Sequence, residues 1–342
     1  MNNIYGYTLI QLESEAVKNG FKKFNATQIF QWLYQKNVAN FDQMKNIGVE
    51  SRKKLNELFC FQHFELVDTL QDDKQDTIKF LFKLFDGQKI ETVIMKFNYG
   101  YSVCVSTQVG CNMGCKFCAS GLLKKIRDLE TWEIVYQVVY VNNFLLKKNE
   151  RISNIVVMGI GEPFDNYENL KDMLQIVTNH NGLGIGSRHI TVSTCGIIPK
   201  ILMFAKDFPQ INLAISLHAS NDKLRSSLMP INNAYSLKEL IKVLKEYEVI
   251  TKRKITFEYI LLKTINDSKE NAYELVNLLK GINCYVNLIS YNKISEHSFE
   301  KSDKQDEFAK ILISHKIQAI TRLERGVKIN AACGQLRAKY EK

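Results

Sequence analysis

The amino-acid sequence predicts an α/β fold, a partial (β/α)6 barrel of the TIM type with a small helical domain at its amino terminus and a connecting β-hairpin. Between residues 100 and 290, six short apolar runs alternate with amphipathic stretches of helical spacing, which is the pattern of repeated strand–helix units. Before these units, helical periodicity gives way to strand alternation around one turn. A doubly wound parallel sheet uses the same alternation of strands and helices and is the structural alternative.

The six apolar runs are the predicted strands of the barrel. They cover residues 102–106, 154–158, 189–193, 211–217, 255–261 and 284–290. Runs that are apolar on both faces suit a parallel sheet, because helices cover one side and a packed interior fills the other. Six units suit an open barrel better than the closed eight-fold form, and functional groups then belong just past the carboxyl ends of the strands.

The part of the chain before the barrel divides into two segments. The stretches "ATQIFQWLYQKN" (26–37) and "VESRKKLNELF" (49–59) carry apolar residues three and four positions apart, as amphipathic helices do. The stretch "DTIKFLFKLFDGQKIETVIMKF" (76–97) alternates around Asp86 and Gly87, which indicates a hairpin. We therefore expect three parts, listed as a helical accessory domain at 1–75, a hairpin linker at 76–100, and the barrel core with a carboxy-terminal segment at 101–342.

Composition and charge narrow the class of protein. No apolar run among the 342 residues approaches the roughly 18 needed to span a membrane, and the amino terminus lacks the regions of a secretory signal. We expect a cytoplasmic protein without a membrane partner, in which eight reduced cysteines indicate metal binding or catalysis rather than disulfides. The net charge of +10 and basic clusters such as "SRKK" (51–54) and "KKIR" (124–127) favour a nucleic-acid partner over a merely solvated surface.

Three cysteines stand together in "CNMGCKFC" (111–118), directly after the first predicted strand. Cys111, Cys115 and Cys118 have no fourth cysteine beside them, although a structural zinc site normally takes four ligands. Three thiolates on a four-iron cubane leave one iron open as a catalytic coordination site. The alternative is a zinc ion whose fourth ligand is Cys60, Cys195 or Cys284.

The loop resembles the signature of radical S-adenosylmethionine (SAM) enzymes, including the aromatic Phe117 before its last cysteine. Nearly the whole chain resembles the RlmN/Cfr-type RNA adenosine methyltransferases, and it is nearer to the RlmN branch. The resemblance lies in "ETVIM" (91–95), "CVSTQVGCNMGCKFCASG" (104–121), "MGIGEPFDN" (158–166), "VSTCGIIP" (192–199), "ISLHA" (215–219), "LMPIN" (228–232), "FEYILLKTIND" (257–267) and "AACGQLR" (331–337). It implies one [4Fe-4S] cluster per chain on Cys111, Cys115 and Cys118, with SAM chelating the open iron as the source of a radical.

The resemblance also implies three catalytic residues. Cys333 matches the cysteine that is methylated first and then carries the methyl group to adenine as a covalent protein–RNA intermediate. Cys104 matches the helper cysteine that releases this intermediate by forming a disulfide with Cys333. Glu91 matches the general base that removes the proton from the ring carbon, a role that depends on its reach and its pKa.

Further matches concern the binding of SAM. The Gly-Glu-Pro turn meets the amino group of the cofactor, and the Glu162 carboxylate is a suitable acceptor for an ammonium. The full set of matched contacts is Gly161, Glu162, Pro163, Ser193, Ser216, Leu217, His218 and Asn292. Asn330 and Lys293 depart from the usual pattern of the family and leave open how the carboxy-terminal loop is held.

The implied function is methylation of carbon 2 of a specific adenosine in 23S rRNA and of the adenosine 3′ to the anticodon in tRNA, using two SAM molecules. The implied partners are these RNAs and an electron donor such as flavodoxin or ferredoxin, and we expect a monomer. One alternative is the antibiotic-resistance branch, which methylates carbon 8, although Pro163 favours the RlmN branch. A non-catalytic zinc-stabilised RNA-binding module and a radical enzyme acting on protein are the others.

Overall fold

The computed structural model describes residues 1–74, 76–294, 298–322, 325–332 and 334–336. The helices are α1 (Leu9–Lys18), α2 (Lys23–Tyr34), α3 (Val49–Leu58), α4 (Thr131–Leu146), α5 (Tyr167–Thr178), α6 (Ile198–Asp207), α7 (Asp222–Leu228), α8 (Leu237–Thr251), α9 (Lys269–Leu279) and α10 (Gln305–Ser314). The strands are β1 (Asn2–Asn3), β2 (Phe59–Cys60), β3 (Glu65–Gln71), β4 (Thr77–Lys83), β5 (Lys89–Phe97), β6 (Gly100–Cys104), β7 (Gln108–Val109), β8 (Arg127–Asp128), β9 (Ile152–Val157), β10 (Ile190–Thr194), β11 (Asn212–Ser216), β12 (Ile255–Leu261), β13 (Cys284–Ser290) and β14 (Gln318–Thr321). Within these residues, none of the helices combines the length and the apolar character that a membrane crossing needs.

The centre of the molecule is one ten-stranded sheet in the order β14-β13-β12-β11-β10-β9-β6-β5-β4-β3. Within this sheet, the neighbouring strands β6, β9, β10, β11, β12, β13 and β14 pair in parallel, as a barrel of strand–helix units requires. The two ends of the order, β14 and β3, are not hydrogen-bonded to each other, so the barrel is open. All six predicted strands are present, and the predicted partial barrel is confirmed.

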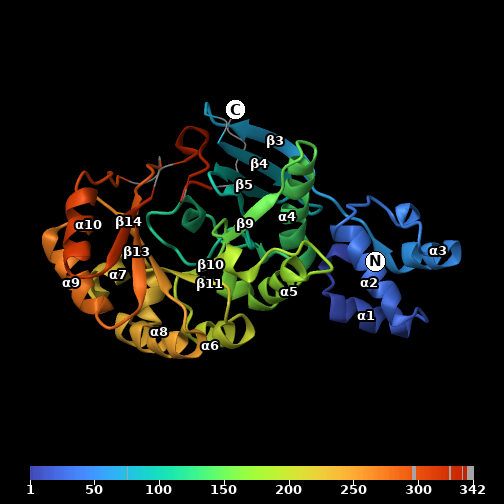
Figure 1. Cartoon of the computed structure of the whole chain (residues 1–342). Helices are drawn as coiled ribbons and strands as arrows, with labels where there is room; N and C mark the ends of the chain where they lie inside the picture. Colours follow the sequence, from blue (N-terminus) through green and yellow to red (C-terminus); the bar gives the residue numbers. More distant parts are fainter. Residues whose placement is uncertain (75, 295–297, 323–324, 333, 337–342) are drawn as a thin grey trace.

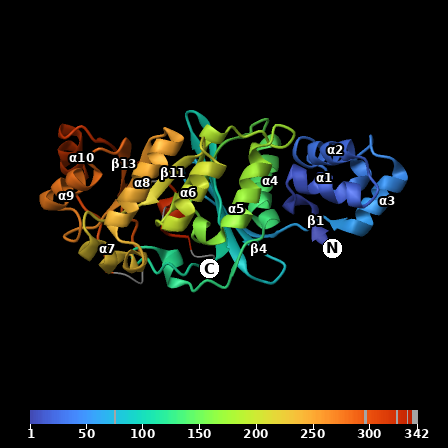
Figure 2. The same ribbon diagram turned by 90° about the horizontal axis from the view of Figure 1, so that it is seen from below.

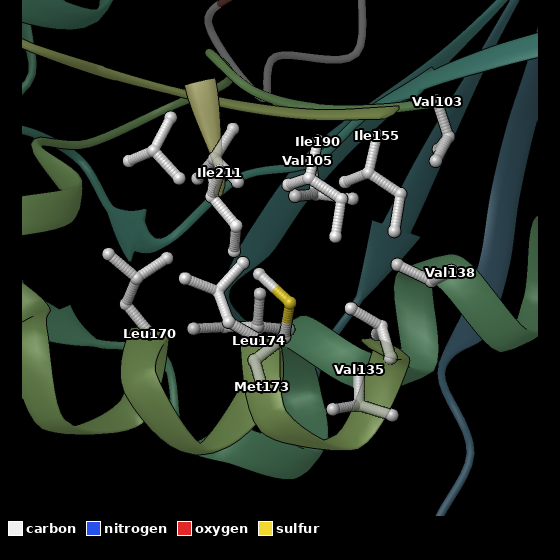
Figure 3. Close-up of a cluster of buried hydrophobic side chains, with 14 of the residues drawn as sticks. Val103, Val105, Val135, Val138, Ile155, Leu170, Met173, Leu174, Ile190 and Ile211 are labelled. Carbon is white, nitrogen blue, oxygen red and sulfur yellow. The ribbon is translucent and has the colours of Figure 1, made fainter. Parts of the chain in front are cut away.

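The helices cover the outer side of this sheet, where α4, α5, α6 and α8 lie in a row (Figure 2). Figure 3 shows how the two layers interlock, with β-branched side chains of β6, β9 and β10 facing Val135 and Val138 of α4 and Leu174 of α5. Fully buried aliphatic side chains dominate this core. Its burial is the main favourable contribution to folding, at about 1.5–3 kcal/mol for each large side chain.

The amino-terminal helices α1, α2 and α3 form a separate group at one end of the molecule (Figure 1). A capping box between Thr8 and Gln11 starts α1, and the buried Tyr5 links the group to α4 through its ring contact with Tyr136, at 5.6 Å between centroids. The predicted helical periodicity of 26–37 and 49–59 is thus confirmed by α2 and α3.

The predicted hairpin is also present, as β4 and β5 around Gly87, whose φ of +82° favours glycine. Besides the two-residue strands β1, β2, β7 and β8, the sequence analysis missed two strands of the ten-stranded sheet. β3 lies inside the segment expected to be helical, and β14 follows α10. Each carries mostly exposed or half-exposed residues at an end of the sheet order, so neither has the apolar signal of a central strand.

Candidate active site

Two adjoining cavities open at the carboxyl ends of the barrel strands. The cysteine cavity, of about 160 Å³, is lined by residues that include Cys111, Cys115, Cys118, Gly161, Glu162, Pro163, Ser193, Ser216, His218 and Glu258. The apolar cavity, of about 370 Å³, is lined by residues that include Val93, Met95, Phe97, Cys104, Asn292, Arg325, Ala331 and Leu336. They share a wall made by Cys118, Ser120, Met158, Gly159, Ile289, Arg322 and Gly334. A molecule bound in one cavity therefore lies next to a molecule bound in the other.

The three-cysteine loop lies between the short paired strands β7 and β8, which close its base. The Cys111 amide donates to the Leu123 carbonyl at 2.9 Å, which folds the loop back on itself. Gly110 makes this fold possible, because its φ is +77° and a Cβ there would lie 2.2 Å from the Lys124 carbonyl oxygen. The loop thereby presents all three cysteines on the wall of the cysteine cavity.

The thiol groups of this loop fit an iron–sulfur cluster. Burial raises the pKa of Cys111 to about 12 and that of Cys115 well above its usual range, so both need a bound cation to become thiolates. Among the described residues, no three His, Cys, Asp or Glu side chains converge as the ligands of a single metal ion do. A cubane places each thiolate on a different iron atom, so three cysteines spread along one wall suit it better than they suit zinc.

Glu162 enters the cysteine cavity in a fixed orientation. Its two carboxylate oxygens accept from the amides of Phe164, at 3.0 Å, and Cys195, at 2.8 Å. Its own amide donates to Oε1 of Gln108 at 2.9 Å, and Gly161, with φ of +104°, lets Gln108 approach. Burial raises the pKa of Glu162, and the hydrogen bonds that it accepts oppose this rise.

Polar groups from the next two strands complete the wall. Ser193 is the penultimate residue of β10 and Ser216 is the last of β11, and their hydroxyl oxygens lie 3.4 Å apart. The His218 ring packs edge-on against Phe117 at 4.7 Å between centroids. Its Nδ1 accepts from the Ile260 amide at 3.0 Å, and burial lowers the pKa of His218 to about 3, so the ring is neutral.

Two of the predicted SAM contacts do not line the cysteine cavity. Leu217 is fully buried and lines neither cavity. Asn292 lines the apolar cavity rather than the cysteine cavity. The other six predicted contacts lie together on the cysteine cavity, where the resemblance places SAM.

The structure adds a residue that the sequence analysis missed. Arg225 is completely buried, and its guanidinium donates to the carbonyls of Cys195 at 2.7 Å and Ser216 at 3.3 Å. A further bond joins it to Oδ1 of Asn232 at 3.1 Å. Arg225 thus ties together the ends of β10 and β11 behind the cavity. Arg225 lies in α7, a short and mostly polar helix, so the sequence alone does not indicate this role.

Of the predicted catalytic residues that the structure describes, one lines the apolar cavity and one does not. Cys104 is buried on β6 and lines it. Glu91 is buried on the neighbouring strand β5 and lies outside the lining, where Oε1 forms an ion pair of 2.9 Å with Lys79 of β4. Lys79 also donates to the Asn330 carbonyl at 3.2 Å. This ion pair therefore connects β5 to the carboxy-terminal segment.

Cys333, the predicted methyl carrier, lies outside the described residues, but the residues on both sides of it are described. The Gly334 carbonyl accepts from the Ala119 amide at 2.7 Å, and the Leu336 carbonyl accepts from the Ser120 hydroxyl at 2.8 Å. On the other side, Ala331 and Ala332 line the apolar cavity. The carboxy-terminal segment is thus fastened to the end of the three-cysteine loop.

Comparisons with known proteins agree with this arrangement. The Radical SAM superfamily matches residues 105–276, and the ribosomal RNA large subunit methyltransferase N-terminal domain matches residues 2–61. A protein of Spiroplasma citri named "Probable dual-specificity RNA methyltransferase RlmN" is 52% identical over 341 residues, covering 100% of this chain and 99% of its own. The chain belongs to the RlmN family. A protein of the same name from Malacoplasma penetrans is 53% identical and covers 99% of this chain and 97% of its own.

A solved structure of a radical SAM methyltransferase from Sphaerobacter thermophilus matches the whole RlmN-family chain, with a TM-score of 0.94 and 42% identity. The match covers 99% of this chain and 100% of that one. As a member of the RlmN family, the chain is a radical SAM methyltransferase that uses a [4Fe-4S] cluster and SAM. The resemblance inferred from the motifs is thereby confirmed.

Proposed function

We propose that the chain methylates carbon 2 of adenosines in two kinds of RNA, namely 23S rRNA at the peptidyl transferase centre and tRNA at the position 3′ to the anticodon. Relatives about 50% identical over the full chain carry a name that specifies dual-specificity RNA methylation. The net charge of +10 suits an RNA partner. The observation that carries the proposal is the wall shared by the two cavities, which puts Cys118 beside the chamber that contains Cys104.

Cys111, Cys115 and Cys118 would hold the cluster, and Glu162 with Ser193, Ser216 and His218 would surround SAM. When bound, these cofactors supply a methyl group and a radical able to take a hydrogen atom from it. Glu162 offers a carboxylate already oriented by two amides, so an ammonium can bind it without reorganisation. His218 stays neutral near pH 7 and adds no positive charge beside a sulfonium.

In this proposal Cys333 carries the methyl group. A sulfur carrier is needed because of the reactivity of the target carbon. Carbon 2 of adenine is electron-poor, so it cannot attack a sulfonium methyl directly, whereas a sulfur-bound methylene radical can add to it. The covalent bond between Cys333 and RNA must then be broken. The Cys104 sulfur attacks the Cys333 sulfur, and the electron pair of the carbon–sulfur bond passes to the methylene carbon on the RNA. This carbon takes up the proton that the Cys104 thiol has released and becomes the methyl group. The Cys104–Cys333 disulfide that forms is then reduced by an external thiol.

Glu91 would remove the proton from the ring carbon before this release. The unpaired electron that the radical addition leaves on the ring would return to the electron carrier, which restores the aromatic ring. The Lys79 ammonium lies 2.9 Å from the Glu91 carboxylate and holds this side chain in place. Because Lys79 also binds the Asn330 carbonyl, it positions Glu91 relative to the segment that leads to Cys333. Lys79 is therefore a positioning residue of the proposed base.

We further propose that the protein is a cytoplasmic monomer that takes electrons from a donor such as flavodoxin or ferredoxin. The amino-terminal helical domain, with the basic cluster "SRKK" at 51–54, would grip RNA. The target adenosine would leave its stack, since a stacked base cannot reach a cavity inside the protein.

Replacing the proposed methyl carrier tests this mechanism. Cys333→Ala, reconstituted with iron and sulfide, should retain the cluster and cleave SAM but give no methylated RNA. Cys284→Ala is the matched control, because Cys284 is a buried cysteine that lines neither cavity. Methylated RNA from Cys333→Ala would overturn the proposed mechanism.

A further inference from the structure

An exposed aromatic residue stands on the turn between β5 and β6, above the apolar cavity. Phe97 pairs with Gly100, which leaves only Asn98 and Tyr99 in the turn. Gly100 has φ of +120°, and a Cβ there would lie 1.9 Å from the Ser153 hydroxyl oxygen, so this position of the hairpin requires glycine. Tyr99 is nevertheless 64% exposed.

The Tyr99 ring continues a stack that begins in the cavity wall. It lies on the Phe97 ring with centroids 4.9 Å apart and planes 7° from parallel. The Arg325 guanidinium lies 4.5 Å from the centroid of Phe97 and is held by an ion pair of 3.3 Å with Asp76. Phe97 and Arg325 both line the apolar cavity. The stack therefore runs from the cavity to solvent.

The charged side chains that line the apolar cavity are positive. Within the described chain, the charged residues that line the apolar cavity are Arg322 and Arg325, and the other lining residues are mainly aliphatic. Arginine beside an exposed aromatic ring suits RNA, because the ring stacks on a base and the guanidinium pairs with phosphate. A protein or lipid partner would use the apolar surface but would not require the cations.

We propose that Tyr99, supported by Phe97 and Arg325, is a stacking platform for the nucleobase next to the target adenosine. The proposal rests on the proposed function, since it assumes that the target base enters the apolar cavity. When the target adenosine is extruded, the neighbouring base loses a stacking partner. This loss is part of the free-energy cost of extrusion. The Tyr99 ring, stacked on a residue of the cavity wall, would replace the lost partner.

The test combines protein variants with RNA that lacks one base. The substrates are a hairpin RNA containing the target adenosine and the same RNA with an abasic residue on its 5′ or its 3′ side. The enzymes are the wild type, Tyr99→Ala, Tyr99→Trp and the control Tyr273→Ala, which removes a half-exposed ring on α9 that lines neither cavity. Methylation of Cys333 in the absence of RNA, followed by protein mass spectrometry, checks that each variant remains folded and binds SAM.

Tyr99→Ala should lower kcat/KM on intact RNA by about tenfold, the size expected for one base–aromatic stack. Tyr99→Trp should recover most of this loss, and Tyr273→Ala should match the wild type. Removal of the base at one of the two positions should lower kcat/KM of the wild type about tenfold. The same change should lower kcat/KM of Tyr99→Ala less than about twofold, because this variant has already lost the stacking contact. The platform proposal would be wrong if Tyr99→Ala and the wild type had equal kcat/KM. It would also be wrong if each abasic position lowered kcat/KM equally in both proteins. A wild type that methylates Cys333 but no RNA would instead overturn the proposed function.

Discussion

The two cavities are built in different ways although they share a wall. Hydrogen bonds with backbone groups fix the side chains of the cysteine cavity: Glu162 and His218 accept from amides, and the supporting Arg225 donates to a carbonyl. Packing shapes the apolar cavity, where Val93, Cys104, Ala331 and Leu336 belong to one buried cluster. The first cavity suits small polar cofactors, and the second suits a flat aromatic base.

The difference also concerns which parts of the chain take part. The cysteine cavity is formed mainly at successive strand ends of one barrel. The apolar cavity needs the β5–β6 hairpin, the end of β13 and the carboxy-terminal segment to meet. Changes around the first should therefore act on cofactor binding, and changes around the second should act on RNA chemistry.

The largest expected effect falls on the shared wall. Cys118→Ala removes a proposed cluster ligand, so iron content after reconstitution and RNA methylation should both be lost. The control Cys284→Ala should retain both. Normal methylation by Cys118→Ala would contradict the assignment of the cluster to this loop.

A change in the apolar cavity should separate RNA chemistry from cofactor binding. Cys104→Ala should bind the cluster and SAM normally but stop after the bond between Cys333 and RNA has formed. Denaturing gels of reactions with labelled RNA should then show a covalent adduct in place of free product. Clean turnover without adduct would count against the proposed role of Cys104.

The buried ion pair behind the apolar cavity should affect stability as well as activity. Lys79→Met leaves the Glu91 carboxylate buried without this cation, which should lower the free energy of unfolding by about 3 kcal/mol. Lys83→Met changes an exposed lysine of the same strand, paired with the exposed Glu65, and should cost at most about 1 kcal/mol. Equal costs in urea unfolding would show that burial of the pair has no energetic role.

The smallest expected effect concerns a residue of the cysteine cavity. Because the folded pKa of His218 is about 3 against an ordinary 6.5, the unfolded chain gains a proton first as the pH falls. Between pH 7 and pH 5 this group alone should remove about 2 kcal/mol of stability. His218→Asn offers an oxygen to the Ile260 amide and tolerates the local φ of +56°, so its stability should fall less over this range. If the free energy of unfolding fell equally with pH in the variant and the wild type, the imidazole of folded His218 would not be neutral.

Much of the fold followed from the sequence because the barrel strands are buried on both faces and stand between amphipathic helices. The three cysteines and the Gly-Glu-Pro turn were equally visible, since each is a local motif. Arg225 was not visible, because its partners are carbonyl groups that come together only in the folded chain. For the same reason, nothing in the spacing of Tyr99 and Arg325 shows that both stand around Phe97.

The most direct test of the central claim is mass spectrometry of nucleosides from protein-free large-subunit RNA that lacks the modification. The RNA would first be incubated anaerobically with reconstituted enzyme, a reductant and SAM. The account predicts 2-methyladenosine. The appearance of 8-methyladenosine, or cleavage of SAM without any methyladenosine in either this RNA or tRNA, would contradict it.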